Sequence, residues 1–429
     1  MGILQSILNI IVQLMTDAGI MVALVALIGL LALRERPEKV FSETVKTAFG
    51  MYIILAGVNL LLGNVGSLPQ ILSHAFAPNV TLPQEGTSGE IIGKYGSTIG
   101  WAMLIAFVTN LILARVTRWK FVYLSGHIIW QNIIILIAIF TAVGLQIGAV
   151  TTVVIGVLLG IYDTIMPALV QPWSRKVSGS DDFGLGHSIN IGMIVAGVLG
   201  GIVGKPEDST EKLKFPDRLA FMSDPGVVAA LIFFVVFALG LIFAGPAYIQ
   251  ENFAKAAGQH WLVWVVIQSL KGATGLLLIF YGARTLLASI VPSFRGIALR
   301  VIPNAKPALD MPVFFGYAPV ALILGTVVML ITELIMMLVI GFVAPAYIVF
   351  PALIATFFEG GTAGIFGNAT GGIRGAVVGA FVVGVIDMVG LATILPLTRA
   401  AADFMRILAL SDYGTLYNVF AHLLKLVLG

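Results

Sequence analysis

Two polar side chains, His127 and Gln131, stand four residues apart inside an otherwise apolar stretch, Ser125-Gly-His-Ile-Ile-Trp-Gln131. Residues four apart share one face of a helix, so we expect both side chains to point the same way. An imidazole and an amide side by side can hydrogen-bond the hydroxyl groups of a polyol-like ligand. The alternative is that the pair packs one helix against another.

His187 and Asp310 are two further candidates for chemistry. His187 ends the sequence Phe183-Gly-Leu-Gly-His187, where an imidazole can exchange a proton with a substrate hydroxyl near neutral pH. Asp310 could accept two hydroxyl protons or act as a general base, and an ion pair with Lys306 is the structural alternative. The five histidines have no metal-ligand spacing, so we expect no metal site and no cofactor.

Other ionisable residues lie within apolar stretches, where a charge is costly and is therefore a candidate for function. Asp163 and Asp387 have two interpretations, a structural role and a role in ion coupling. For Glu333 and Arg284, a buried charge pair or a position at the lipid interface is the simpler interpretation. Glu359 lies in a glycine-rich segment, and its role stays open.

The elements that position these residues are predicted to be membrane-spanning helices. Of the 429 residues, 59% are hydrophobic and 10% are charged, which is more apolar than a soluble fold can hide. Apolar stretches fit to cross a roughly 30 Å hydrocarbon core occur at 18–33, 51–62, 101–114, 121–145, 147–167, 227–249, 261–291, 313–343, 374–397 and near the C-terminus. They predict an all-α, polytopic membrane protein with roughly ten or eleven spans. The net charge of +3 gives no basic face, so no nucleic-acid partner is expected.

The chain contains an internal duplication. Two approximate copies, 18–204 and 227–410, precede a C-terminal helix at 411–429 in one transporter unit, 1–429. Basic residues fall in non-equivalent loops of the two copies, and cytoplasmic loops favour Lys and Arg. We therefore predict an inverted repeat, with the N-terminus and residues 64–93 outside and residues 295–306 and the C-terminus inside. Equivalent positions include Gly50 and Gly275, Gly57 and Gly282, and Asp163 and Asp387.

Inverted repeats are typical of transporters, whose sites lie where interrupted helices line a cavity. Two segments are candidate re-entrant elements. Residues 171–204 combine a polar stretch with an apolar run too short for a span, and residues 356–372 are rich in glycine between two apolar segments. Channels remain possible but are less favoured.

Four motifs together resemble those of the ascorbate-specific membrane component, enzyme IIC, of the bacterial phosphotransferase system, in the ascorbate and galactitol superfamily. The motifs are Ser125 to Gln131, Phe183 to His187, Pro303 to Asp310, and Gly364-Ile-Phe-Gly-Asn-Ala-Thr-Gly-Gly372. The resemblance implies a homodimer with about eleven spans per protomer, two re-entrant hairpins and elevator-like alternating access. It also implies a multi-pass protein of the bacterial inner membrane.

The resemblance further implies a substrate site. Its residues would be Tyr95, Gly96, Ser97, His127, Gln131, His187, Ser188 and Asp310. The family often has Gln where this chain has Ser188, and the shorter side chain leaves room for another ligand or a water. L-ascorbate is the expected substrate, and a galactitol-like alditol or related sugar acid is the alternative.

The absence of cysteine excludes a phospho-cysteine in this polypeptide. The resemblance places the phosphoryl donor on such a residue of a IIB component, so IIB and IIA are expected as separate cytoplasmic partners. This chain would then bind substrate, move it inward and present it for phosphorylation as the translocating subunit of a phosphotransferase. An ion-coupled secondary transporter is the alternative function.

Overall fold

The computed structural model describes residues 17–65, 87–213, 224–344 and 355–428, together with isolated positions between them. Most of the first sixteen residues and most of 66–86 lie outside the described part, as does much of the loop expected on the outer side. The helices are α2 (Ala18–Ala32), α3 (Pro37–Val65), α5 (Ser88–Val116), α6 (Gly126–Ala142), α7 (Ala149–Ser178), α8 (Asn190–Val203), α9 (Pro225–Ala244), α10 (Pro246–Ile249), α11 (Trp261–Arg300), α12 (Pro319–Val343), α14 (Gly361–Ile394), α15 (Ala402–Ile407) and α16 (Asn418–Leu428).

Six helical stretches among the described residues are long and apolar enough to cross a membrane, or seven if a bent pair is one span. That pair, Ala229–Ala244 and Pro246–Ala254, bends by 112°, as a broken span or a re-entrant loop does. The expectation of a multi-span helical protein is confirmed, while about eleven spans is more than these helices supply. Three further apolar helices, α2, α6 and α8, have only 14 to 17 residues.

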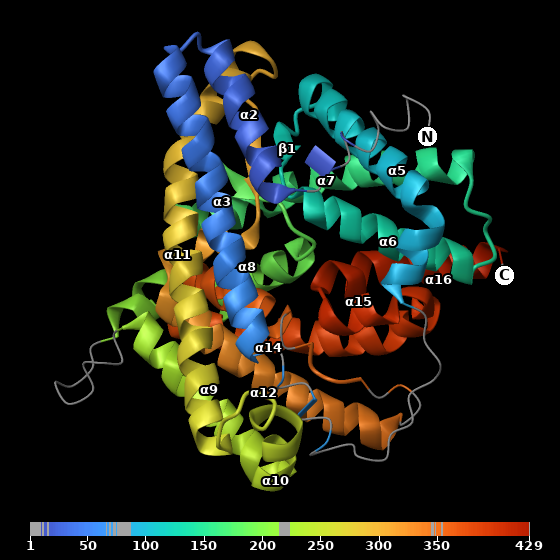
Figure 1. The fold of residues 1–429 in the computed structure, drawn as a ribbon. Coiled ribbons are helices and arrows are strands. Elements are labelled where there is room, and N and C mark those ends of the chain that lie inside the picture. Colours follow the sequence, from blue (N-terminus) through green and yellow to red (C-terminus); the bar gives the residue numbers. More distant parts are fainter. Residues whose placement is uncertain are drawn as a thin grey trace.

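One group of helices is formed by α2, α3, α9 and α11 (Figure 1). In it, α3 and α11 run antiparallel with their backbones in close contact. A Cβ built on Gly57 would lie 2.6 Å from the Gly275 carbonyl oxygen, and one on Gly275 would lie 2.6 Å from the Gly57 oxygen. Only glycine permits this approach, and we call the four helices the scaffold group.

A second group contains α5, α7, α8, α12 and α14. Its α14 is interrupted at Gly372, whose backbone has φ 60° and ψ −148°. Gly367 and Gly375, on the two sides of this break, pack directly against each other, so the chain reverses there. Residues 356–372 thus form one arm of a helical hairpin, at a position predicted for a re-entrant element.

The other predicted re-entrant segment, 171–204, also turns back. It contains the end of α7, a short strand and α8, which packs along α14. Gly200 of α8 and Gly204, which directly follows α8, meet Gly371 at the tip of the α14 hairpin, and a Cβ on any of the three would collide with backbone. The two glycine-rich segments predicted separately are therefore packed together.

The expectation of an all-α fold is wrong in one respect, because three short strands form a parallel sheet. They are β1 (Phe121–Tyr123), β2 (Gly184–Leu185) and β3 (Lys306–Leu309), in the order β1-β3-β2. Val122 pairs with Pro307, and Leu185 pairs with Leu309. The apolar stretch 121–145 is predicted to be one span, but it divides into β1 and α6 because β1 pairs with β3.

Both outer edges of this sheet are closed by side-chain amides. Asn110 donates to the Phe121 carbonyl (3.0 Å) and accepts from the Tyr123 N–H (3.0 Å). On the other edge, Gln171 donates to the Phe183 carbonyl (3.0 Å). Non-helical backbone is tolerated at membrane depth only where protein satisfies its polar groups, and these two amides do so.

Candidate functional site

The carboxyl ends of the three parallel strands bring the sequence motifs together. β1 leads into α6 and His127, β2 leads into His187, and β3 ends immediately before Asp310. Strands that run parallel end at the same edge of a sheet, so residues far apart in the sequence become neighbours there. This sheet is the element that assembles the candidate site.

His127 and Asp310 are hydrogen-bonded. The Nε2 atom of His127 lies 3.2 Å from Oδ2 of Asp310, and Oδ1 accepts the N–H of Met311 (2.7 Å). A carboxylate only accepts, so Nε2 of His127 carries a proton, and in the neutral imidazole Nδ1 is then an acceptor. That Nδ1 atom is buried and has no partner among the described residues.

His187 lies on the other side of the same carboxylate. Its Nε2 atom is 3.8 Å from Oδ1 of Asp310, and its side chain is only 5% exposed. Its Nδ1 atom is also buried without a partner in the described part of the chain. The preceding Gly186 is required by the sheet, because a Cβ there would lie 2.6 Å from the Ala308 carbonyl oxygen.

Gln131 follows His127 by one helical turn of α6, as the spacing predicts. Its Oε1 atom is buried and unpartnered among the described residues. The site therefore presents two unpartnered imidazole nitrogens and one unpartnered amide oxygen beside a carboxylate. Hydroxyl groups, which both donate and accept, match such atoms.

Ser188 contributes to the site indirectly. Its hydroxyl donates to Oδ1 of Asn132 (3.0 Å), which also accepts the hydroxyl of Tyr413 (2.8 Å). All three residues are fully buried. Asn132 and Tyr413 were not among the predicted site residues. Asn132 is one of the few polar residues in the apolar stretch, whereas nothing in the sequence links Tyr413 to α6.

Asp412 fixes the segment that carries His187 and Ser188. Its Oδ1 accepts the Ile191 N–H (2.7 Å) in the first turn of α8, and its Oδ2 accepts from Asn190 (3.0 Å) and Tyr162. Its own N–H donates to the Ser188 carbonyl (3.3 Å). A carboxylate at a helix N-terminus satisfies free N–H groups, so this distant residue acts as a cap for α8.

The predicted residues Tyr95, Gly96 and Ser97 lie at a break in α5. Tyr95 has non-helical angles (φ −120°, ψ 21°), and Gly96 and Ser97 are exposed. Ser97 borders a separate cavity of about 410 Å³ beside Gly148 and Thr152. Among the described residues, no hydrogen bond or ion pair joins this segment to the His127 and Asp310 pair.

Lys306 does not pair with Asp310, so that structural alternative is wrong. Its ammonium group pairs with Asp181, in the loop before β2. Burial raises the pKa of Asp181, but hydrogen bonds from Lys306 and Gln171 outweigh it and hold the pKa below its usual value. The Asp310 carboxylate therefore contacts the imidazoles of His127 and His187 and not Lys306.

The remaining intramembrane carboxyl groups form no ion pair within the described part of the chain. Glu333 accepts the Thr356 hydroxyl, and Glu359 accepts the Ser411 N–H (3.1 Å). Arg284 is exposed, so a buried pair with Glu333 is excluded. Both carboxylate oxygens of Asp163 are buried without a hydrogen-bond partner, and Asp387 lies beside Glu359. In the described residues, no three His, Asp or Glu side chains are placed to hold a metal ion.

Comparison with known proteins gives two matches. The family described as the sugar-specific permease component of the PTS system, EIIC-GAT, matches residues 13–416. The chain is also 22% identical over 343 residues to the ascorbate-specific PTS system EIIC component of Mycoplasma pneumoniae. That match covers 70% of this chain and 52% of the relative, so the chain spans about half the relative's length.

Proposed function

Because this chain belongs to the family of sugar-specific EIIC permease components of the phosphotransferase system, we propose that it binds a polyhydroxylated substrate between His127, Gln131, His187 and Asp310. It carries that substrate across the membrane for phosphorylation.

The observation that carries this proposal is a set of unpartnered polar atoms. Nδ1 of His127, Nδ1 of His187 and Oε1 of Gln131 are buried and unbonded among the described residues. A buried polar atom without a partner costs roughly 1–3 kcal/mol, so a site with three of them favours a ligand that supplies hydrogen-bonding groups. A compact ligand with several hydroxyl groups, which both donate and accept, supplies those partners at once.

L-ascorbate is the substrate we propose. The four sequence motifs and the name of the Mycoplasma relative support this choice. In our proposal Ser188 acts through Asn132, and the backbone around Tyr95, Gly96 and Ser97 contributes only after α5 moves. An alditol of the galactitol type is the alternative.

The phosphoryl donor in this proposal is a second protein, because the family resemblance places the phosphoryl group on a cysteine and this chain has none. We propose that a phospho-cysteine of a IIB component, recharged by IIA, is the donor. A substrate hydroxyl oxygen forms the new bond to phosphorus, the S–P bond breaks, and the hydroxyl proton ends on the released cysteine thiol. Positioning of the hydroxyl supplies most of the catalysis, because loose phosphoryl-transfer transition states need little help from a base.

We also propose that the two halves are inverted repeats in an elevator-type homodimer in the bacterial inner membrane. Reciprocal contacts support the repeat. Gly50 meets Leu286, and Gly275, the repeat equivalent of Gly50, meets Leu61, the equivalent of Leu286. Such an exchange of partners is what a two-fold axis between α3 and α11 produces. We place the N-terminus outside and the C-terminus in the cytoplasm.

Substrate binding by the purified protein tests the proposal. Titration with L-ascorbate and with a panel of alditols should give saturable binding. His127→Ala and Gln131→Ala should each weaken binding by about 1–3 kcal/mol, or roughly fivefold to 150-fold. Gln268→Ala, which changes a buried glutamine in α11, is the control and should bind normally. Wild-type affinity in both site variants would mean that His127 and Gln131 only pack one helix against another.

Ion-coupled transport is a second candidate, favoured by the unpartnered carboxyl group of Asp163. An unpaired buried carboxylate is costly unless it binds a proton or a cation. Uptake that persists without any phosphoryl-transfer protein, and stops when the ion gradient is removed, would select this function.

A further inference from the structure

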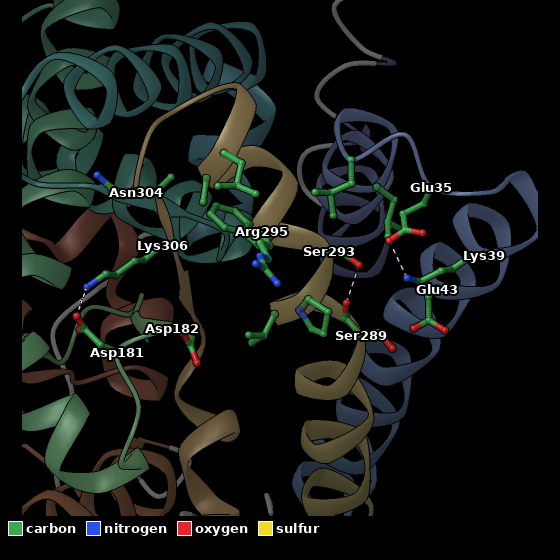
Figure 2. A pocket seen from close by; sticks show the side chains of 18 residues that line it. Glu35, Lys39, Glu43, Asp181, Asp182, Ser289, Ser293, Arg295, Asn304 and Lys306 are labelled. Atoms are coloured by element: carbon green, nitrogen blue, oxygen red, sulfur yellow. Dashed lines mark hydrogen bonds and ion pairs between the residues drawn. The ribbon is translucent and has the colours of Figure 1, made fainter.

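A cavity of about 1030 Å³ lies between the scaffold group and the amino ends of two strands. One wall is formed by the turn between α2 and α3 and by the end of α11. The other wall is formed by Asp181 and Asp182 before β2 and by Asn304 to Lys306 at the start of β3 (Figure 2). The volume is at the upper limit of the roughly 300–1,000 Å³ typical of small-molecule pockets.

The cavity is distinct from the candidate site. Neither His127, His187 nor Asp310 borders it. Four residue steps along β3 separate Lys306 from Asp310, which is roughly 13 Å at 3.3 Å per residue. The small sheet therefore has the substrate residues at one end and this cavity at the other.

Three cations and four carboxylates, Glu35, Glu43, Asp181 and Asp182, border the cavity, and two of the cations are paired with carboxylates of the lining. Lys39 contacts Glu35 (2.7 Å), and Lys306 contacts Asp181. The third, Arg295, has no carboxylate partner among the described residues. In Figure 2 it projects from α11 between the two ion pairs. Asp182, on the opposite wall, accepts the hydroxyl of Ser180 (2.6 Å).

The backbone that carries Arg295 is held firmly. A Cβ on the neighbouring Gly296 would collide with the Gly29 backbone, and Gly29 is equally tight against the Ser293 carbonyl. The opposite wall is tied by the Lys306 N–H, which donates to the Lys120 carbonyl (2.7 Å), and by the Gln171 bond to Asp181 (2.8 Å). The exposed side chain of Arg295 thus projects from tightly packed backbone, on which a recognition site can be supported.

We propose that this cavity receives the phosphoryl-bearing loop of the donor protein and that Arg295 pairs with its phosphoryl group. The proposal rests on the proposed function and on its orientation, with this end of the molecule in the cytoplasm. A guanidinium matches a phosphoryl group with two parallel N–H bonds, which a lysine cannot reproduce. Because the substrate site lies beyond the sheet, transfer follows a movement that brings the two together.

The test uses the full-length protein with phosphorylated and unphosphorylated IIB. We expect Arg295→Gln to raise the KM for phospho-IIB at least tenfold and to abolish the preference for phospho-IIB over IIB. Affinity for L-ascorbate should stay unchanged, and Arg295→Lys should recover part of the loss. Arg300→Gln, an equal change of charge on an exposed residue of α11 outside the cavity, is the control and should leave KM unchanged.

Two results would overturn the proposal. One is an Arg295→Gln variant whose KM for phospho-IIB stays within twofold of the wild-type value. The other is a parallel loss of L-ascorbate binding, which would give Arg295 a structural role. Failure of the proposed function is recognised separately, since the wild-type protein would then bind no polyhydroxylated substrate.

Discussion

Replacing Asp310 by asparagine tests the chemistry of the site most directly. The carboxylate makes two bonds that asparagine cannot make together, to the His127 Nε2–H (3.2 Å) and to the Met311 N–H (2.7 Å). If the amide oxygen keeps the Met311 bond, the amide N–H groups face the Nε2–H of His127. His127 must then move its proton to Nδ1, which changes the atom offered to substrate from an acceptor to a donor.

The expected loss follows from that exchange. The variant loses the bond between the charged Asp310 and His127, and His127 no longer offers an acceptor to the substrate. Together these losses are worth about 1.5–3 kcal/mol, so Kd for the substrate should rise about tenfold to 150-fold. Phosphoryl transfer to bound substrate should continue at nearly its normal single-turnover rate. A base at this position would instead show normal binding and a rate lower by about 10²–10⁴.

The assay combines titration of substrate with single-turnover transfer from phospho-IIB. Asp224→Asn is the matched control, since Asp224, like Asp310, accepts a backbone N–H, that of Gly226 (2.8 Å) in α9. An Asp310→Asn variant that is normal in both assays would refute the site as described.

Three further predictions concern topology and packing. Cysteines introduced at Glu90 and Arg300 should be labelled from opposite sides of the membrane, and labelling of both from one side would contradict the inverted repeat. Gly371→Ala places a methyl group against the backbone of α8 and should lower the free energy of unfolding by about 1–3 kcal/mol, measured by thermal unfolding. An unchanged Tm would show that the hairpin tip can move aside. Tyr413→Phe removes the hydroxyl that donates to the buried Asn132 amide oxygen and should lower the free energy of unfolding by about 1–3 kcal/mol. An equally stable variant would show that this bond contributes nothing.

The polar residues of the site were predictable because they are costly. His127, Gln131 and His187 stand out in apolar surroundings, where a polar side chain requires a partner. The spacing of the first two also gave their common face on α6. The partners were not predictable. Lys306 is nearer to Asp310 in the sequence than Asp181 or His127 is, yet the strand separates Lys306 from Asp310 and leaves each with a distant partner.

By itself, the sequence determined that this chain is a helical membrane protein with glycine-rich reversals, because apolar length and glycine content act locally. It also indicated which polar side chains need an explanation. Tertiary structure alone decided the sheet and the pairing around it. Strands of two to four residues have no local signal, and they become stable only when three distant segments satisfy one another's backbone groups. Asn132, Tyr413 and Asp412 lie at the site for the same reason, because hydrogen bonds between segments far apart in the sequence hold them there.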